Sequence, residues 1–556
     1  MVTGELASSV ADTPPLTIPS ALARSALTCP LSPALTDGRT RLTYRQLQEE
    51  VLGIGRVLAQ RVKTGDRVAL QLPRSAEYVV LYLAVLSIGA AVLPLSHELS
   101  EAETVTELAT CAPVLLLRDP DVRAARRPFP AAGDDGTAPA PAVMDIAVCA
   151  HTDGDLTRLR SAVGRAPRAG VTGTHAAPGG GADPESPAVL LATSGSFGLP
   201  KRVVLTHRAL LANARAHRAS LDATAHRETA LAAVPLNFGY CNTVQLVGQF
   251  DSAGHVVLLG GDFLPSRFGR LVEEHRVTST LLVPSMLRLL TLGDWHRTYD
   301  LSSLRHIVYG GAPTPPEILR DLERRLPGVE LVETYGQTEA GPRITTMRPR
   351  DRAAHPGSVG RPLPGVEVTI RDRDFRPLPP GATGEIVVRG PGTMTGYHAR
   401  PEETARVLRG GRLLTGDLGR LDKDGFLYLS GRLRNIAIVS GMNVSLEEVE
   451  ACLTAHPAVT EAVCGVRADA RAGETLVAWV RLTVAEQATV LDELTGFCRA
   501  RLSAHKLPRR IVAVADFPRT RTGKIDRSAV LARSRAAPPR TDGPGPDMPE
   551  AEEVGG

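Results

Sequence analysis

Helical stretches alternate with short apolar runs along much of the chain. Residues 42–59 carry apolar side chains at helical spacing, residues 66–70 form a short apolar run, and a second helical stretch begins at Ala76. The alternation resumes further along and continues to Arg343, with predicted strands at residues 188–192, 256–259, 279–283 and 306–309. Short apolar strands separated by helices predict doubly wound α/β layers.

The pattern changes further along the chain. Residues 360–431 read as short strands joined by tight turns, which predicts a small β-rich layer. A mixed helix and strand pattern then returns. We therefore predict an α/β fold with a large N-terminal domain at residues 1–434 and a small mobile α+β C-terminal domain at 435–535. Residues 536–556, rich in Pro, Gly and acidic residues, are expected to be a disordered tail.

Composition narrows the class of protein. A chain of 556 residues is too long for one hydrophobic core, and its net charge of +4 gives no case for nucleic acid binding. The seven cysteines include no Cys-x-x-Cys pair, which argues against a disulfide framework or a zinc site and for a cytoplasmic location. The apolar stretch 79–95 is short and interrupted, so we expect no membrane span. Residues 1–35, rich in Ser, Pro and Ala, are expected to be loosely ordered.

A loop rich in hydroxyls and glycines follows the predicted strand at 188–192. Its residues are Thr193, Ser194, Gly195, Ser196, Phe197, Gly198, Leu199, Pro200 and Lys201. Such a loop presents backbone N–H groups and hydroxyl donors to an anion, and its lysine adds the charge that a polyphosphate needs. It is not a Walker A loop, because a proline precedes the lysine. Taken alone, it could equally be an ordinary Gly/Ser connection.

Four further segments have residue types that suit a nucleotide. Residues 310–313 (Gly-Gly-Ala-Pro) allow backbone to approach a flat ring, and residues 335–339 (Tyr-Gly-Gln-Thr-Glu) combine an aromatic face, a hydroxyl and a carboxylate. Residues 415–417 (Thr-Gly-Asp) offer an acid to two ribose hydroxyls, and residues 518–525 place Lys524 directly after a glycine. Only five of the 64 lysines and arginines are lysines, so Lys201 in the first loop and Lys524 in the last segment suggest a need for a compact ammonium.

Together with residues 431–435, these motifs resemble those of the adenylate-forming superfamily in order and spacing. The superfamily contains acyl-CoA synthetases, adenylation domains and luciferases, and the resemblance spans residues 35–530. It implies that ATP activates a small carboxylic acid to an acyl adenylate with release of pyrophosphate, after which the acyl group passes to a thiol. The implied cofactors are ATP, Mg²⁺ and a CoA or phosphopantetheine thiol.

The resemblance also implies a role for each motif. Lys524 would be the catalytic lysine, Thr338 would contact the α-phosphate, and Glu339 would act in catalysis as the Mg²⁺ ligand. The implied ATP-binding residues are Thr193, Ser194, Gly195, Ser196, Gly198, Lys201, Gly311, Ala312, Tyr335, Gly336, Gln337, Asp417 and Arg432. The remaining implied residues are Phe238, Gly239 and Gly310 in the substrate pocket, Gly441 in the thiol tunnel and Asn435 at the hinge.

The chemistry explains why these residue types are needed. A carboxylate must attack the α-phosphorus in line while pyrophosphate leaves, so two anions are forced together. A lysine and a metal ion offset that repulsion, and positioning supplies much of the remaining rate enhancement.

Three positions depart from common patterns of the family, and a fourth bears on the substrate. Phe197 and Arg202 stand where the family usually has Thr and often Gly, and Asn435 replaces an acidic hinge residue. Gly239 stands where activators of α-amino acids usually carry the Asp that pairs with the substrate ammonium. The expected substrate is therefore a fatty or aromatic acid without an α-ammonium group.

Two other functions remain open at this point. One is a stand-alone adenylation enzyme that loads a separate carrier protein or another acceptor, since no carrier domain follows Lys524 in the chain. The other is a nucleotide-binding pseudoenzyme, prompted by Phe197 and Asn435. Retention of Glu339, Asp417 and Lys524 argues against the pseudoenzyme.

Overall fold

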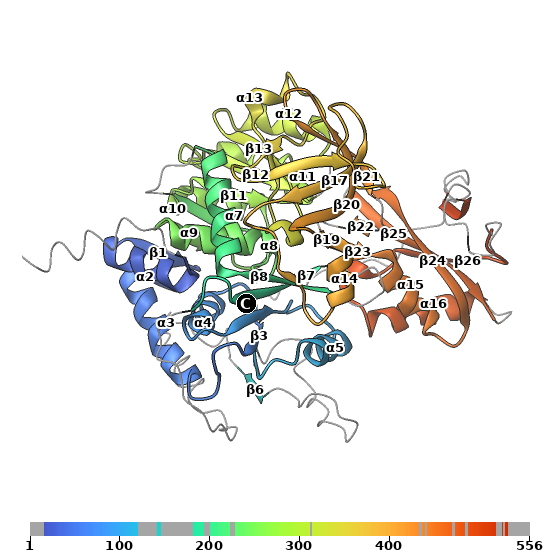
Figure 1. Ribbon diagram of the computed structural model, residues 1–556, viewed down its shortest axis with the longest axis horizontal. Helices are drawn as coiled ribbons and strands as arrows, with labels where there is room; N and C mark the ends of the chain where they lie inside the picture. The colour runs from blue at the N-terminus through green and yellow to red at the C-terminus, as the bar shows by residue number, and fades with distance from the viewer. Residues whose placement is uncertain are drawn as a thin grey trace, which may run out of the picture.

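The computed structural model describes residues 16–119, 142–145, 182–193, 201–222, 228–311, 314–432, 436–439, 442–469, 473–483, 487–518, 525 and 529–531. Four β-sheets with helices packed against them make up this part of the chain (Figure 1). The strands and helices predicted up to Arg343 are confirmed within two residues at each end. The predicted α/β class is therefore confirmed.

The largest sheet is mostly parallel and has nine strands in the described residues. Its order is β15 (Arg361–Pro362), β14 (Thr345–Met347), β13 (Glu330–Tyr335), β12 (His306–Gly310), β11 (Ser279–Leu282), β9 (Thr229–Ala232), β10 (His255–Leu258), β1 (Pro33–Thr36) and β2 (Arg41–Thr43). The six strands from β13 to β1 are parallel to their neighbours, while β14, β15 and β2 pair antiparallel at the edges. Strands such as β10 and β11 are buried at every position, as parallel strands covered on both faces should be.

A seven-stranded sheet lies beside it. Its order is β18 (Gly396–Tyr397), β8 (Lys201–Thr206), β7 (Pro187–Thr193), β4 (Ala91–Pro94), β3 (Arg67–Gln71), β5 (Leu115–Arg118) and β6 (Ala142–Asp145). Helix α4 (Ala76–Ser87) is buried at every position, in a core that also includes residues of both large sheets. A helix that is apolar all round, as α4 is, suits this central place.

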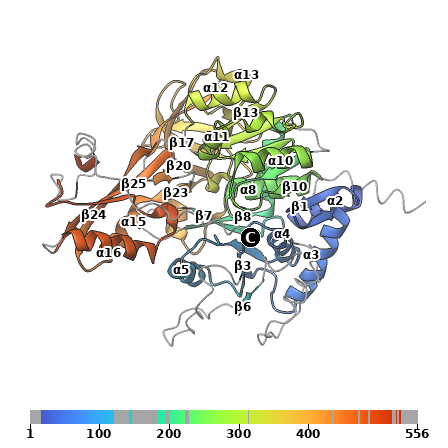
Figure 2. The ribbon, with the colours of Figure 1, turned by 180° about the vertical axis from the view of Figure 1, so that it is seen from behind.

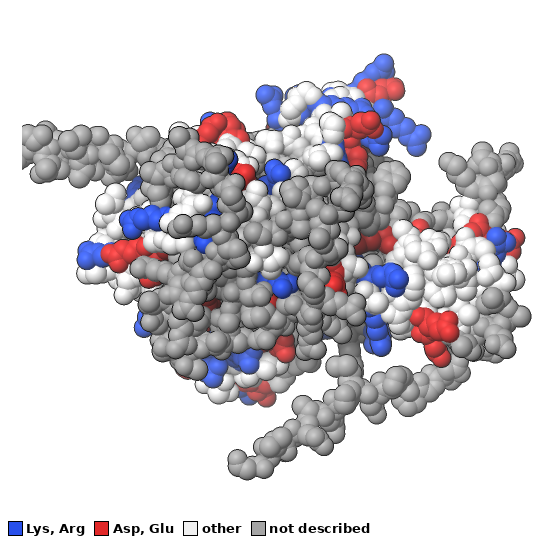
Figure 3. Space-filling view, turned by 90° about the horizontal axis from the view of Figure 1, so that it is seen from below, with Lys and Arg blue, Asp and Glu red and all other residues white. Residues whose placement is uncertain are grey.

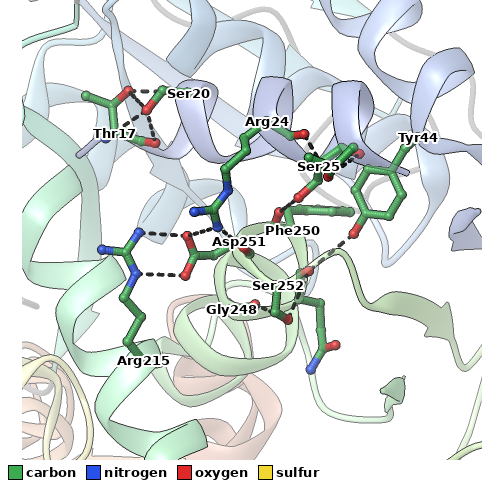
Figure 4. A network of polar contacts seen from close by, with 12 residues as sticks. Thr17, Ser20, Arg24, Ser25, Tyr44, Arg215, Gly248, Phe250, Asp251 and Ser252 are labelled. Atoms are coloured by element: carbon green, nitrogen blue, oxygen red, sulfur yellow. Dashed lines mark hydrogen bonds and ion pairs between the residues drawn. The ribbon is translucent and has the colours of Figure 1, made fainter. Parts of the chain in front are cut away.

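The expectation of loose order for the first 35 residues is wrong from residue 18 onward. Helix α2 (Ile18–Thr28) begins with a capping box at Thr17. Figure 4 shows Arg24 of this helix and Arg215 reaching the same Asp251 carboxylate, whose Oδ1 lies 3.5 Å and 2.7 Å from the two guanidinium nitrogens. Thr17 therefore serves as a helix cap, and Arg24 makes a tertiary contact.

The predicted β-rich layer is present as a small antiparallel sheet. It consists of β16 (Glu367–Arg371), β17 (Gly384–Arg389), β20 (Arg412–Leu421) and β19 (Leu408–Arg409), with β21 (Leu427–Arg432) paired to β20. The turn between β20 and β21 contains Gly425 at φ +80°, a backbone conformation that favours glycine.

A second five-stranded sheet forms the C-terminal part of the fold. It contains β23 (Met442–Ser445), β22 (Ile436–Val439), β25 (Gly473–Leu482), β24 (Val459–Asp469) and β26 (Arg510–Ala513), with helices α15 (Leu446–Thr454) and α16 (Gln487–Arg499). This part has its own hydrophobic core and lies at one side of the molecule, in orange and red (Figures 1 and 2). The predicted boundary at residue 434 and the predicted tail lie outside the described residues, so the domain limits stay a prediction.

The remaining helical segments are mostly short. They are α3 (Tyr44–Leu58), α5 (Glu101–Cys111), α7 (His207–Ser220), α8 (Gly239–Cys241), the π-helix η2 (Asn242–Val247), α9 (Gly248–Asp251), α10 (Pro265–His275), α11 (Pro284–Leu290), η3 (Trp295–Arg297), α12 (Pro316–Arg325), η4 (Thr338–Ala340), α13 (Pro349–Arg352), α14 (Pro401–Val407) and η5 (Ala504–Lys506). Within the described parts of the chain, no helix combines the length and apolar character needed to cross a bilayer. On the face drawn in Figure 3, basic and acidic side chains are interspersed, in keeping with the small net charge.

Candidate active site

The carboxyl ends of two parallel strands bring the glycine motifs together. Strands β12 and β13 are neighbours, and their register pairs Gly310 with Thr334, one residue before Tyr335. A Cβ on Gly310 would clash with the carbonyl of Thr334, and one on Gly336 would clash with the carbonyl of Pro342. Only glycine fits these two positions, which lie at the edge of the sheet where open α/β folds bind ligands.

Tyr335 and Asp417 form a buried polar pair beside these glycines. The Tyr335 hydroxyl donates to Asp417 Oδ2 over 2.7 Å, and both residues are less than 10% exposed. Asp417 lies on β20, one residue after Gly416, whose φ is +72°. The register of β20 and β21 sets Asp417 opposite Arg432, so two predicted ribose-binding residues occupy adjacent strand positions.

Glu339 lies in the 3₁₀ turn η4 directly after the tyrosine motif. It is 7% exposed and accepts a hydrogen bond from the Tyr397 hydroxyl, whose oxygen is 2.9 Å from Glu339 Oε1. The side chain of Tyr397 in turn lies under the Lys201 ammonium, 4.8 Å from the ring centroid to Nζ. Tyr397 thus links the Glu339 carboxylate to the buried Lys201 ammonium.

Lys201 is held in place by an ion pair. Its Nζ contacts the carboxylate of Glu403 on α14, and the lysine is only 3% exposed. Burial raises the pKa of Glu403, but hydrogen bonds and charges from Lys201 and Arg400 outweigh it, and the net pKa is lowered. Lys201 stands opposite Thr193 in the antiparallel pair of β7 and β8, so these two residues close the ends of the candidate phosphate loop.

The candidate substrate residues pack against the same motifs. Phe238 precedes the one-turn helix α8, and a Cβ on Gly239 would lie 3.2 Å from Leu191 Cδ1 and 3.6 Å from Thr338 Cγ2. The following segment, η2, is a π-helix, a rare geometry that is frequent at functional sites. Gly239 is therefore adjacent to the residue expected to meet the α-phosphate.

Sequence reasoning missed Arg343, the most deeply buried cation near this site. It has no exposed surface, and its guanidinium carbon lies 3.9 Å from the ring centroid of Tyr240. Burial lowers the pKa of Arg343 to about 10, against the opposing charge interaction of Tyr240. A charged residue between Pro342 and the apolar Ile344 was the available signal.

Arg202, singled out as a departure, does not face the nucleotide motifs. Its guanidinium is buried on β8, with Nε 2.8 Å from Glu107 Oε2, and it donates to the carbonyls of Pro94 and Leu190. Burial lowers the pKa of Arg202, but the charge and hydrogen bond of Glu107 outweigh it and raise the pKa overall. The residue therefore joins strand β8 to helix α5.

Several predicted residues lie outside the described part of the chain. They are Ser194, Gly195, Ser196, Phe197, Gly198, Ala312, Asn435, Gly441 and Lys524. Gly310, Tyr335, Glu339 and Asp417 lie on β12, β13, η4 and β20, and the contact between Tyr335 and Asp417 joins the carboxyl end of β13 to β20.

Comparisons with known proteins identify the family of the chain. A family model described as "AMP-binding enzyme" matches residues 22–398, and a model of the "AMP-binding enzyme C-terminal domain" matches residues 448–524. A medium-chain fatty-acid–CoA ligase of Escherichia coli is 33% identical over 489 residues, covering 85% of this chain and 82% of that protein.

Solved structures are similar over almost the whole chain. An o-succinylbenzoate CoA synthetase of Bacillus subtilis, a double mutant bound to a product analogue, has a TM-score of 0.78 at 27% identity and covers 92% of this chain and 98% of that one. The same synthetase in complex with AMP has a TM-score of 0.62 at 26% identity, with 91% and 97% coverage. An amide bond synthetase of Marinactinospora thermotolerans has a TM-score of 0.78 at 31% identity, with 92% and 99% coverage.

Proposed function

Because the chain belongs to the adenylate-forming superfamily of AMP-binding enzymes, we propose that Asp417, Glu339 and Lys524 of this chain bind and activate ATP. The protein is an AMP-forming acid–thiol ligase. It joins a carboxylic acid to AMP with release of pyrophosphate and then transfers the acyl group to a thiol. The observation that carries the residue roles is the meeting of Gly310, Tyr335 and Asp417 at one sheet edge.

Each residue at this edge has a distinct task in the first half-reaction. The adenine lies against the glycine backbone and the Tyr335 ring, while the Asp417 carboxylate accepts from the ribose hydroxyls. The substrate carboxylate oxygen attacks the α-phosphorus, and the bond to the pyrophosphate oxygen breaks. Lys524 stabilises the charge that builds up on the phosphate oxygens during this step.

Glu339 is the residue suited to hold Mg²⁺. Carboxylate oxygens are the ligands that Mg²⁺ prefers, and the Glu339 carboxylate is buried directly after Thr338, the residue assigned to the α-phosphate. The ion would supply charge neutralisation for the leaving pyrophosphate. The hydrogen bond from Tyr397 holds the carboxylate in place for that role.

The first test is a pyrophosphate-release screen over a panel of carboxylic acids, with and without CoA. ATP turnover that depends on an added acid supports the ligase. A folded protein that binds ATP but does not release pyrophosphate with any acid of the panel would instead support the pseudoenzyme. A cytoplasmic location stays a prediction from the cysteine pattern.

Replacing Asp417 by alanine is expected to weaken ATP binding by about 1.5–3 kcal/mol, the range for a hydrogen bond to a charged group. That loss corresponds to roughly a 10- to 150-fold higher Kd. Isothermal titration calorimetry would measure it. Tyr335→Phe is the matched control, because it removes the observed hydrogen bond to Asp417 and keeps the carboxylate. An unchanged ATP affinity in folded Asp417→Ala would contradict the ribose role.

In this proposal, the C-terminal domain of the structure has the orientation that serves the second half-reaction. The two forms of the B. subtilis synthetase match this chain over nearly the same length and at nearly the same identity, yet the TM-score is 0.78 with the product analogue and 0.62 with AMP. The difference supports a C-terminal domain oriented for thioester formation. Domain rotation between the two steps is the known way in which this superfamily uses one site twice.

The acceptor is proposed to be CoA, which enters past the candidate tunnel residue Gly441. This residue lies in sequence between β22 and β23, which pair antiparallel with Val439 opposite Met442. A thiol that attacks the acyl carbonyl displaces AMP. The likeness to an amide bond synthetase keeps a different acceptor open, and a carrier protein would use the same pantetheine arm as CoA.

Gly441→Trp is expected to leave pyrophosphate release intact and to abolish transfer to CoA, since an indole would fill the pantetheine path. Single-turnover assays from supplied acyl-AMP would measure the transfer. The same assay with a carrier protein and with a simple amine distinguishes the acceptors. Transfer to CoA that survives the tryptophan would mean that the acceptor does not pass Gly441.

A further inference from the structure

Helix α5 of the large domain touches a short segment of the C-terminal part, residues 501–506. Both ribbon views show α5 beside the C-terminal helices α15 and α16 (Figures 1 and 2). The contact is polar and is made by the first turn of α5. Ser100, the N-cap of this helix, donates to the carbonyl of Arg501 over 3.3 Å.

Glu103 is the centre of this contact. Its Oε1 accepts from the backbone N–H of Ser503 at 3.1 Å, from the Ser503 hydroxyl at 2.9 Å and from Lys506 Nζ at 3.1 Å. The side chains of Glu103 and Lys506 are only 11% and 10% exposed. A single carboxylate therefore receives three hydrogen bonds from a part of the chain about 400 residues away.

Glu103 and Lys506 would each keep a polar partner within their own domain if the two domains separated. Lys506 Nζ lies 2.7 Å from Oε1 of Glu448, which belongs to α15 in the same C-terminal part. Glu103 Oε2 accepts from the backbone and hydroxyl of Ser100 at 3.0 Å in a capping box. Removing a buried charge from its only partner costs several kcal/mol, and this arrangement avoids that cost on both sides.

The charge states agree with this geometry. Burial raises the pKa of Glu103, but Lys506 and the hydrogen bonds of Ser100 and Ser503 outweigh it and lower the pKa overall. Burial lowers the pKa of Lys506, and the two carboxylates more than reverse that shift. Glu103 is therefore ionised and Lys506 protonated at neutral pH.

We propose that Glu103 is a positioning residue that docks segment 501–506 on helix α5 and so holds the C-terminal domain in the thioester-forming arrangement. This inference rests on the proposed function, in which that domain changes orientation between the two half-reactions. Lys506, rather than one of the abundant arginines, meets two carboxylates from different domains, a task for a compact ammonium with three donors.

Glu103→Gln tests the proposal without disturbing the helix. Gln also serves at the third position of a capping box, so the cap of α5 is retained while the charge is removed. Transfer from supplied acyl-AMP to CoA should fall about twofold to fivefold, as loss of one ion pair predicts. The rate of acid-dependent pyrophosphate release should not fall. Glu101→Gln, in the same first turn, removes an equal charge as the matched control.

Hydrogen–deuterium exchange gives a second readout that needs no substrate. Residues 501–506 and the first turn of α5 should exchange faster in Glu103→Gln than in the wild type or in Glu101→Gln. Equal slowing of both half-reactions, or unchanged transfer and exchange, would overturn the positioning role. Failure of every acid to support pyrophosphate release would instead refute the proposed function, while the exchange experiment would still decide whether Glu103 docks the segment.

Discussion

Replacing Lys524 by alanine is expected to lower acyl-adenylate formation by about 100-fold or more. The lysine offsets the repulsion between the attacking carboxylate and the α-phosphate, and removal of one such electrostatic group typically costs about 3 kcal/mol in the transition state. Transfer of the acyl group from supplied acyl-AMP should change far less, because that step neither forms nor breaks a bond at the α-phosphorus. Pyrophosphate release and single-turnover thioester formation would measure the two steps separately.

Lys423→Ala is a suitable control for the Lys524 variant. Lys423 is one of the few other lysines and lies exposed in the turn between β20 and β21. Its removal changes the net charge equally and should leave both half-reactions intact. If Lys524→Ala slowed the two steps to the same extent, the assignment of this lysine to adenylation alone would be wrong.

Gly239→Asp should abolish activity on the native acid. A Cβ here already lies 3.2 Å from Leu191 Cδ1 and close to Thr338, so a carboxylate would be buried among apolar atoms beside the substrate acid. An unpaired buried charge costs several kcal/mol, and it would also repel the substrate carboxylate. The pyrophosphate-release screen would measure the loss as a fall in kcat/KM.

Gly239→Asn separates charge from size in this experiment. Asn has nearly the volume of Asp without the charge, so it should retain more activity than Asp if repulsion dominates. Equal losses would attribute the effect to crowding against Leu191. A wild-type enzyme that prefers α-amino acids would contradict the substrate class inferred from the glycine.

The sequence was sufficient to predict those structural features that depend only on local backbone conformation or on residue type. The glycine at 310 was predicted because a flat ligand needs close backbone approach, and the structure leaves no room for a side chain there. The alternating strands and helices were predicted because apolar periodicity decides which face is buried. The first helix was not predicted, because its Ser, Pro and Ala content resembles that of a loop until the tertiary partners of residues such as Arg24 are known.

The sequence by itself determined the family, the order of the layers and the residue types of the nucleotide motifs, since each depends on a few contiguous positions. The partner of each polar side chain was decided only by the tertiary structure. Tyr335 meets Asp417 across 82 residues, and Glu103 meets Lys506 across 403. Arg343 is buried over Tyr240 for the same reason. Such contacts depend on how whole sheets and helices pack, a free energy summed over many buried side chains that no short stretch of sequence contains.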